Sequence, residues 1–389
     1  MKRAPTLDII WLFVATRLLL VLVTFIGFIL IPVPPHVYPV SPVNITGLLT
    51  SWNQWDAANF TRIAQYGYQT IYDTAFFPLL PVLIKCIAFL FGNHGYIAIG
   101  MLLSNMALLG ALFVLYQLAT DILGEQVGRR TLLYLCIFPT AFFFFAAYNE
   151  SLFLLLTASS FLAMRRQKWW LAALLGFFAA LTRAAGVLLV IPFLYELWIT
   201  RDTITSGGQN TFHKTLRALS RILPLLIIPL GTLIYCLYCW KLFHNPFAFA
   251  TVQSHWDRHT AWPWVGIFSA LRELLFVQPF GSFFEVHLLL DLAATMSFIV
   301  LTIVGWRKLR MSYNIWMVLL LFFMLISPAI AQPDVLVSNQ RFVLEMFPAF
   351  ITLAVLGVKY PRFHLGLLIS FPFLQAALAM LFVLNRWMV

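Results

Sequence analysis

Charged side chains are scarce in this sequence. Only 10% of the 389 residues are Asp, Glu, Lys or Arg, whereas 62% are hydrophobic and the mean hydropathy is +0.89. An ordinary soluble domain carries roughly a quarter charged residues, so this composition excludes one. Lipid offers no partner to an open backbone, and a membrane core of about 30 Å requires about 20 apolar residues per helix. Because the apolar runs are continuous and do not alternate, we predict an all-α polytopic membrane protein.

Several chemical signatures are also absent. The sequence contains no Walker loop, no Rossmann glycine fingerprint and no Asp-x-Asp nucleotide-sugar signature. It has four cysteines, and Cys236 and Cys239 form a C-x-x-C inside an apolar segment with no second pair nearby. Packing is the preferred interpretation of these two residues over a metal or redox role. The net charge of +11 is spread over short loops rather than one face, which does not favour a nucleic-acid partner.

The chain divides into a series of apolar segments with short connections. They cover residues 8–31, 76–93, 96–120, 129–146, 148–164, 168–182, 184–199, 221–243, 287–305, 314–331, 342–358 and 364–385. We expect eleven full spans. Segment 76–93 enters only part way, since Pro78 and Pro81 interrupt its start. One long helix over 168–199 is the alternative to a break near residue 183.

The positions of Lys and Arg orient this bundle of about 11–12 helices. Basic residues occupy alternate short loops, which places those loops and the N-terminus in the cytoplasm. Residues 32–75 and 244–286 then form two long external loops of a single domain, 1–389. The expected location is the cell membrane, or the endoplasmic reticulum membrane in a eukaryote.

The stretch SWNQWDAANFTRIAQYGY, residues 51–68, places the carboxylate of Asp56 among aromatic residues in the first external loop. A carboxylate can act as a general base, but Asp56 can also be an N-cap of a short amphipathic helix. Trp52, Trp55 and Tyr68 are candidate substrate contacts, and interfacial anchoring is their alternative role.

Ionisable residues inside apolar segments are candidate site residues because burying them at membrane depth is costly. Arg183 interrupts the apolar run 169–199, and Glu150 is similarly isolated in YNESLF. Arg183 is suited to a phosphate, and an internal ion pair with Glu150 is the alternative. Arg341 raises the same choice between a phosphate and a local i,i+4 pair with Glu345.

The second long loop contains HNPFAFATVQSHWDRH, residues 244–259. Its Gln253, His255, Trp256 and Arg258 are suited to recognising a sugar or a phosphate. Its three histidines lack an accompanying carboxylate motif, so we predict no metal there. A solvated surface helix is the alternative for this segment.

Six of these stretches, in this order, resemble the GPI mannosyltransferase 2 family of GT-C membrane glycosyltransferases. They are WDAANFTRIAQYGY, AFFPLLP, YNESLF, LTRAAG, NPFAFATVQSHWDRH and NQRFVLEMFP, lying between residues 55 and 348. The chain lacks the large loops of the eukaryotic enzymes and is in this respect more similar to a bacterial or archaeal relative.

The resemblance implies an inverting transfer of mannose from polyprenyl- or dolichyl-phosphate mannose to a hydroxyl of a glycolipid or glycan. Asp56 matches the first-loop acidic base of such enzymes, and Arg183, Arg341 and Arg258 are candidates for binding the donor phosphate. No cofactor is expected, and the active site is expected on the external side. A transporter or flippase of lipid-linked sugars, a non-catalytic lipid-binding subunit, and a sugar other than mannose are the alternatives.

Overall fold

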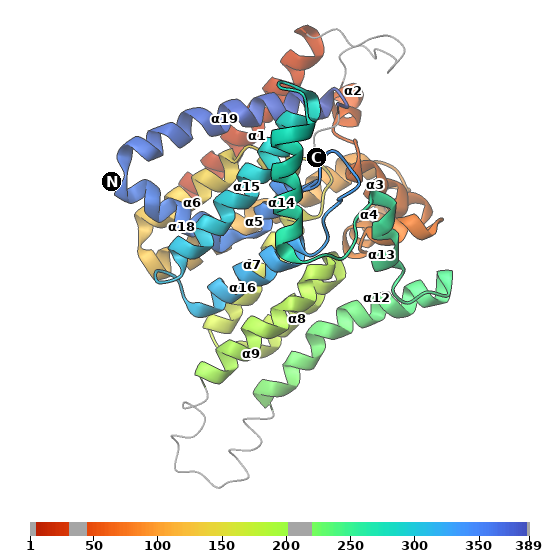
Figure 1. Ribbon diagram of the computed structural model, residues 1–389. Helices are drawn as coiled ribbons and strands as arrows, with labels where there is room; N and C mark the ends of the chain where they lie inside the picture. The colour runs from red at the N-terminus through yellow and green to blue at the C-terminus, as the bar shows by residue number, and fades with distance from the viewer. Residues whose placement is uncertain (1–4, 31–44, 201–219, 387–389) are drawn as a thin grey trace.

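The structure is a computed structural model that describes residues 5–30, 45–200 and 220–386, and its regular elements there are all helical (Figure 1). The long helices of the bundle are α1 (Pro5–Leu30), α5 (Tyr96–Leu123), α6 (Glu125–Ile137), α7 (Glu150–Arg165), α8 (Trp169–Thr182), α9 (Val190–Ile199), α12 (Ile227–Phe243), α15 (Phe283–Gly305), α16 (Met311–Leu325), α18 (Phe347–Lys359) and α19 (Pro361–Val383). The predicted all-α fold is confirmed.

Five helices of the described chain are long and apolar enough to cross a membrane, and a sixth results if one bent pair counts as a span. The five are Thr6–Gly27, Tyr96–Leu123, Ser220–Phe243, Phe283–Gly305 and Pro361–Val383. The protein is therefore a multi-pass membrane protein. Other apolar helices are shorter, at 10–17 residues, including three where full spans were expected: Trp169–Thr182, Ala184–Ile199 and Met311–Leu325.

The segment expected to enter the membrane only part way forms α4 (Leu79–Leu90). Its 12 residues extend about 18 Å at 1.5 Å per residue, which is less than the ~30 Å of a hydrocarbon core. Its length therefore agrees with partial entry.

Proline and glycine determine where several helices break. The predicted helix over 129–146 is wrong in its second half. α6 ends at Ile137, ahead of Pro139, and the chain continues into the short helix η2 (Ala141–Phe144). A residue before proline is biased away from helical geometry. Pro348 similarly lies at the start of α18, which is bent by 86° from the preceding Asn339–Glu345 segment.

The predicted break near residue 183 is confirmed, because α8 ends at Thr182 and a 3-10 helix, η3 (Ala184–Leu189), follows. Gly186 lies in that turn, where a Cβ atom would collide with the backbone of Ala179. Only glycine permits this close approach, so the turn folds back against α8 and leaves Arg183 in extended backbone between the two helices.

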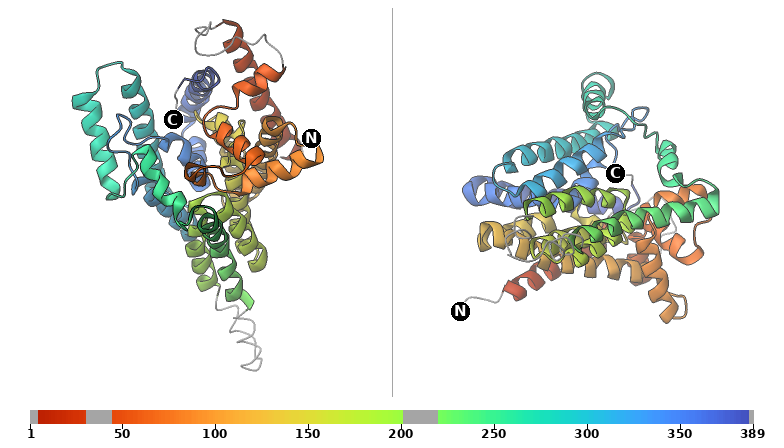
Figure 2. Two further views of the ribbon diagram at one scale, coloured as in Figure 1. Left: turned by 90° about the vertical axis from the view of Figure 1, so that its right-hand side faces the viewer. Right: turned by 90° about the horizontal axis from the view of Figure 1, so that it is seen from below.

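The core of the bundle is made by α5 packing on α7, α7 on α8, α8 on α12, and α6 on α18. At the crossing of α8 and α12, Gly176 faces Ile228 and Gly231 faces the Phe177 carbonyl. Small residues of this kind let membrane helices approach closely. Figure 2 shows α8, α9 and α12 extending together below the rest of the bundle.

The two loops predicted to be external carry short helices. The first contains α2 (Ile45–Ser51), α3 (Asp56–Tyr66) and η1 (Ile71–Ala75), with residues 31–44 outside the described chain. The second contains α13 (Ala248–Thr251), η5 (Val252–Trp256), α14 (Pro263–Arg272) and the π-helical η6 (Glu273–Val277). Because η1 packs on both α13 and η5, the two loops contact each other.

Asp73 fixes the shape of the first loop. It is buried, and it accepts hydrogen bonds from the amides of Gln69 and Thr70 and from the guanidinium of Arg62. Burial alone would raise the pKa of Asp73, but these hydrogen bonds and the Arg62 charge outweigh it and hold that pKa below 3.8. Asp73 is thus a structural carboxylate of the loop.

Candidate functional site

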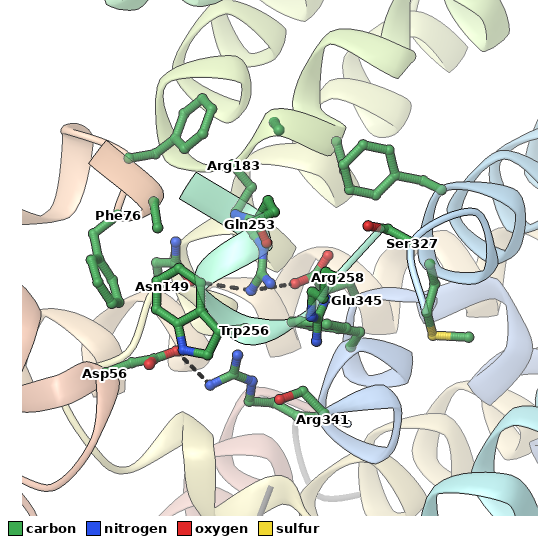
Figure 3. Close-up of a pocket in the computed structure, with 18 of the residues that line it drawn as sticks. Asp56, Phe76, Asn149, Arg183, Gln253, Trp256, Arg258, Ser327, Arg341 and Glu345 are labelled. Carbon is green, nitrogen blue, oxygen red and sulfur yellow. Dashed lines mark hydrogen bonds and ion pairs between the residues drawn. The ribbon is translucent and has the colours of Figure 1, made fainter. Parts of the chain in front are cut away.

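A cavity of about 520 Å³ lies where the two loops meet the bundle (Figure 3). Its lining comes from the first loop, the turn before α7, the break after α8, the second loop, α16 and the segment before α18. Charged side chains occupy part of this surface, and Phe76, Phe77, Leu320, Phe323 and Met324 form apolar parts of the lining. The cavity thus combines an ionic region with an apolar one.

Asp56 lies on the cavity as the first residue of α3. The preceding Trp55 has φ 53° and ψ −122°, a backbone conformation rarely adopted by a residue with a side chain. Trp52 anchors this turn, since its buried indole packs on Phe145 at 4.8 Å and on Phe382 at 5.6 Å. The aromatic residues before Asp56 therefore hold the carboxylate in position.

The carboxylate of Asp56 belongs to a chain of alternating charges. Arg341 Nη1 lies 2.6 Å from Asp56 Oδ2, and Arg341 Nε lies 3.4 Å from Oε1 of the buried Glu150. The same Glu150 oxygen lies 3.0 Å from Arg183 Nη1, which is 2.5 Å from Glu345 Oε1. Figure 3 shows the Asp56–Arg341 and Arg183–Glu345 pairs. Three carboxylates thus share two arginines.

The short helix α17 (Asn339–Phe342) presents Arg341 to Asp56. Polar contacts from α15 and from the turn before η2 hold it: the Gln340 amide donates to Asp291 of α15 at 2.7 Å, and Thr140 of the turn donates to the Gln340 carbonyl at 2.6 Å. Asn339 donates to Thr295 at 3.0 Å. These hydrogen bonds to Asn339 and Gln340 fix the backbone that carries Arg341, while the Arg341 side chain faces the cavity.

Phe342 follows Arg341, and its ring contacts all three arginines of the cavity. The guanidinium carbons of Arg183, Arg258 and Arg341 lie 5.0, 5.2 and 5.0 Å from the centre of this ring. An aromatic face attracts each cation, but three like charges also repel one another. Such a cluster is stable only with anions beside it.

Arg258 differs from the other two arginines. Its described partners are the Val337 carbonyl, to which Nη2 donates at 2.6 Å, and the Phe342 ring. No carboxylate within the described residues forms a salt bridge with it. Burial, reinforced by the charge of Arg341, lowers the pKa of Arg258 to about 10. This guanidinium is the one best placed to gain from binding an added anion.

The second loop reaches the cavity because its backbone pairs with the turn after α16. His259 donates to the Pro328 carbonyl at 3.2 Å, and Ala261 donates to the Ile326 carbonyl at 2.9 Å. This pairing places Gln253 and Trp256 on the cavity beside Arg258.

The residues predicted from sequence to form a site occupy three environments. Those that line the cavity are Trp55, Asp56, Arg183, Gln253, Trp256, Arg258 and Arg341. Glu150 is buried outside the lining, where it contacts Arg183 and Arg341. The ion pair with Arg183 that the sequence offered as the alternative to phosphate binding is present at 3.0 Å. Trp52, Tyr68 and His255 are absent from the lining. Tyr68 donates to the Phe76 carbonyl at 2.6 Å, and His255 packs on Tyr72 at 4.4 Å.

Sequence reasoning missed the partners that complete this cluster. It offered a local pair of Glu345 with Arg341 as one of two choices, whereas Glu345 pairs with Arg183 from another part of the chain. It also omitted Asn149, whose Oδ1 accepts from Arg183 at 3.1 Å, and Phe342. Their adjacency to Glu150 and Arg341 in the sequence was the available signal.

Among the described residues, no group of three His, Cys, Asp or Glu is arranged to hold a metal ion. His244, His255 and His259 are all in this part of the chain. Cys236 and Cys239 are free thiols on α12.

The chain is similar in fold to the solved structure of another protein. ArnT from Cupriavidus metallidurans, solved bound to undecaprenyl phosphate, matches 93% of this chain with a TM-score of 0.51 and 16% identity. The chain spans 62% of the length of ArnT. The apo oligosaccharyltransferase of Archaeoglobus fulgidus gives a TM-score of 0.47 at 13% identity, over 97% of this chain and 56% of that one.

The fold is a GT-C-like membrane fold. A model of the mannosyltransferase (PIG-V) family matches residues 8–201, about half of the chain, and the chain belongs to this family. The resemblance drawn from the sequence motifs is thereby confirmed. No curated protein matches the chain significantly.

Proposed function

We propose that this protein transfers mannose from polyprenyl-phosphate mannose, or its dolichyl equivalent, to a hydroxyl of a glycolipid or glycan. The observation that carries the proposal is one cavity in which a carboxylate, Asp56, lies beside a cluster of guanidinium groups. Family membership supports mannose as the sugar. ArnT, of similar fold, was solved bound to a polyprenyl phosphate, and the proposal places the same ligand chemistry here.

The reaction is a single displacement with inversion. Asp56 accepts the proton of the acceptor hydroxyl, and the hydroxyl oxygen forms a bond with the anomeric carbon. The bond from that carbon to the phosphate oxygen breaks, and its electron pair leaves with the lipid phosphate. Guanidinium groups that are already in place stabilise the charge that develops on this oxygen.

The three arginines are not equivalent in this scheme. Arg183 is held by Glu150, Glu345 and Asn149, and Arg341 is held by Asp56 and Glu150. Arg258 donates only to a backbone carbonyl among the contacts found in the described chain. We therefore assign the donor phosphate first to Arg258.

The remaining lining suits the other parts of the donor. Gln253 and Trp256 adjoin Arg258 and are suited to hydrogen bonding and stacking with the sugar. The apolar lining from α16, formed by Leu320, Phe323 and Met324, is suited to the first units of the prenyl chain. The cavity is proposed to open on the external or lumenal side of the membrane.

The test is mannosyl transfer from polyprenyl-phosphate mannose to acceptors in a membrane extract. We compare the wild type with Asp56→Asn, and with Asp121→Asn as control, because Asp121 is an exposed carboxylate near the end of α5. We expect transfer by the wild type and the control, and a loss of roughly 10³-fold or more in Asp56→Asn.

Equal transfer by all three proteins would refute the assignment of Asp56 as the base. Binding of the lipid without transfer by any of them, with acceptors confirmed competent, would favour a transporter or flippase.

A further inference from the structure

Arg341 is shared between the proposed base and the rest of the charge cluster. Its Nη1 lies 2.6 Å from Asp56 Oδ2, and its Nε lies 3.4 Å from Glu150 Oε1. The proposed reaction changes the charge of one of these partners. Before transfer Asp56 is an anion, and after transfer it holds the acceptor proton and is neutral.

The same reaction adds charge to the phosphate. A sugar-linked phosphodiester carries one negative charge, and the released lipid phosphate carries close to two near neutral pH. One acceptor O–H bond and one phosphate C–O bond break, while one sugar C–O bond and one Asp56 O–H bond form. The total charge is conserved, but one negative charge moves from Asp56 to the phosphate.

We propose that Arg341 changes partners during this step, from the Asp56 carboxylate in the donor complex to the departing phosphate in the product complex. The inference rests on the proposed function and adds a role for Arg341 that differs from that of Arg258. Arg258 binds the phosphate throughout, whereas Arg341 binds it when Asp56 no longer needs a counter-charge. Proton uptake by the base thereby strengthens stabilisation of the leaving group.

The surroundings of Arg341 permit such a change. Its guanidinium carbon lies 5.6 Å from the ring centre of Phe143, 5.5 Å from that of Tyr148 and 5.0 Å from that of Phe342. The three rings can keep cation–π contacts with the guanidinium while the Arg341 side chain rotates from one partner to the other. The backbone of α17 does not need to move, since Gln340 remains bonded to Asp291 and Thr140.

Arg183 cannot take this role in the same way. Its Nη1 contacts Glu150, Glu345 and Asn149, none of which changes charge in the reaction. Of the three arginines that line the cavity in the described structure, only Arg341 forms a salt bridge with Asp56, the proposed proton acceptor.

The test is a double-mutant cycle on binding of polyprenyl phosphate, the reaction product, and it needs no turnover. Asp56→Asn imitates the neutral, protonated base and releases Arg341. We expect Asp56→Asn to bind polyprenyl phosphate roughly 10-fold more tightly than the wild type. Arg341→Gln should cost less than about 3-fold in the wild-type background, and roughly 10-fold or more in the Asp56→Asn background.

Arg341→Lys in the Asp56→Asn background should retain most of the gain, since it keeps the charge. Thermal unfolding of each variant checks that loss of binding is not loss of fold.

Equal effects of Arg341→Gln in both backgrounds, or no tightening by Asp56→Asn, would overturn the partner change and leave the proposed function standing. If the folded wild type does not bind polyprenyl phosphate, the proposed function itself fails. The two failures are therefore distinguishable.

Discussion

Replacing Arg258 by Gln removes the cavity arginine that lacks a carboxylate partner in the described structure. A hydrogen bond to a charged group contributes about 1.5–3 kcal/mol net. We therefore expect the dissociation constant of polyprenyl-phosphate mannose to rise roughly 10–150-fold, at 1.4 kcal/mol per factor of ten. The same substitution should affect kcat less than the affinity for the donor, because Arg258 is proposed to contact the phosphate both before and after transfer.

The assay is equilibrium binding of the lipid donor to the purified protein in detergent. Arg258→Lys keeps the charge but not the bidentate geometry, and it should retain part of the affinity. Arg272→Gln is the matched control, because Arg272 is an exposed arginine of the same loop outside the cavity lining.

An unchanged donor affinity in a folded Arg258→Gln protein would refute the assignment of the phosphate to Arg258. An equal loss in Arg272→Gln would show that the effect is a general response to the charge of the loop.

Three further substitutions test the site and its supports. Gly186→Val should lower the melting temperature or prevent folding, since its side chain would collide with the backbone of Ala179. Asp73→Asn should destabilise the protein near pH 7, and the difference from wild type should vanish as the pH falls. The pKa of Asp73 is held below 3.8 in the folded state. The ionised side chain therefore stabilises the fold at pH values above its unfolded-state pKa, and this stabilisation is lost as the pH falls through its folded-state pKa. Glu345→Gln should tighten binding of polyprenyl phosphate several-fold, since it removes a carboxylate 2.5 Å from an arginine of the cavity.

Melting temperatures of the detergent-solubilised proteins check the first two, the second across the range from about pH 7 to pH 3, and lipid binding checks the third. A Gly186→Val protein as stable as wild type would mean that the turn after α8 can open. A constant difference between Asp73→Asn and wild type at all pH values would show that the side-chain charge of Asp73 is not what stabilises the loop. Weaker binding by Glu345→Gln would mean that Glu345 is needed to hold its arginine in place.

Much of the architecture follows from the sequence because lipid leaves few alternatives. Apolar segments must be helical at membrane depth, and helices lie at every segment that hydropathy marked. The break at Arg183 was visible as a cation inside an apolar run. The break at Pro139 was overlooked, because the residues that follow it, Ala141–Phe144, are as apolar as a continuing span.

The sequence by itself also singled out Asp56, Arg183, Arg258 and Arg341, since they are charges that a membrane protein rarely keeps without need, and all four line the cavity. Their pairing was decided by the tertiary structure alone. Asp56 and Arg341 are separated by 285 positions in the sequence, yet Arg341 Nη1 lies 2.6 Å from Asp56 Oδ2. Local spacing favours partners one helical turn away, but at the bend before α18 the counter-charge of Glu345 is Arg183, from the break after α8. Coulombic attraction is strong only over short distances and therefore decides which charges pair, and only the folded chain provides those distances.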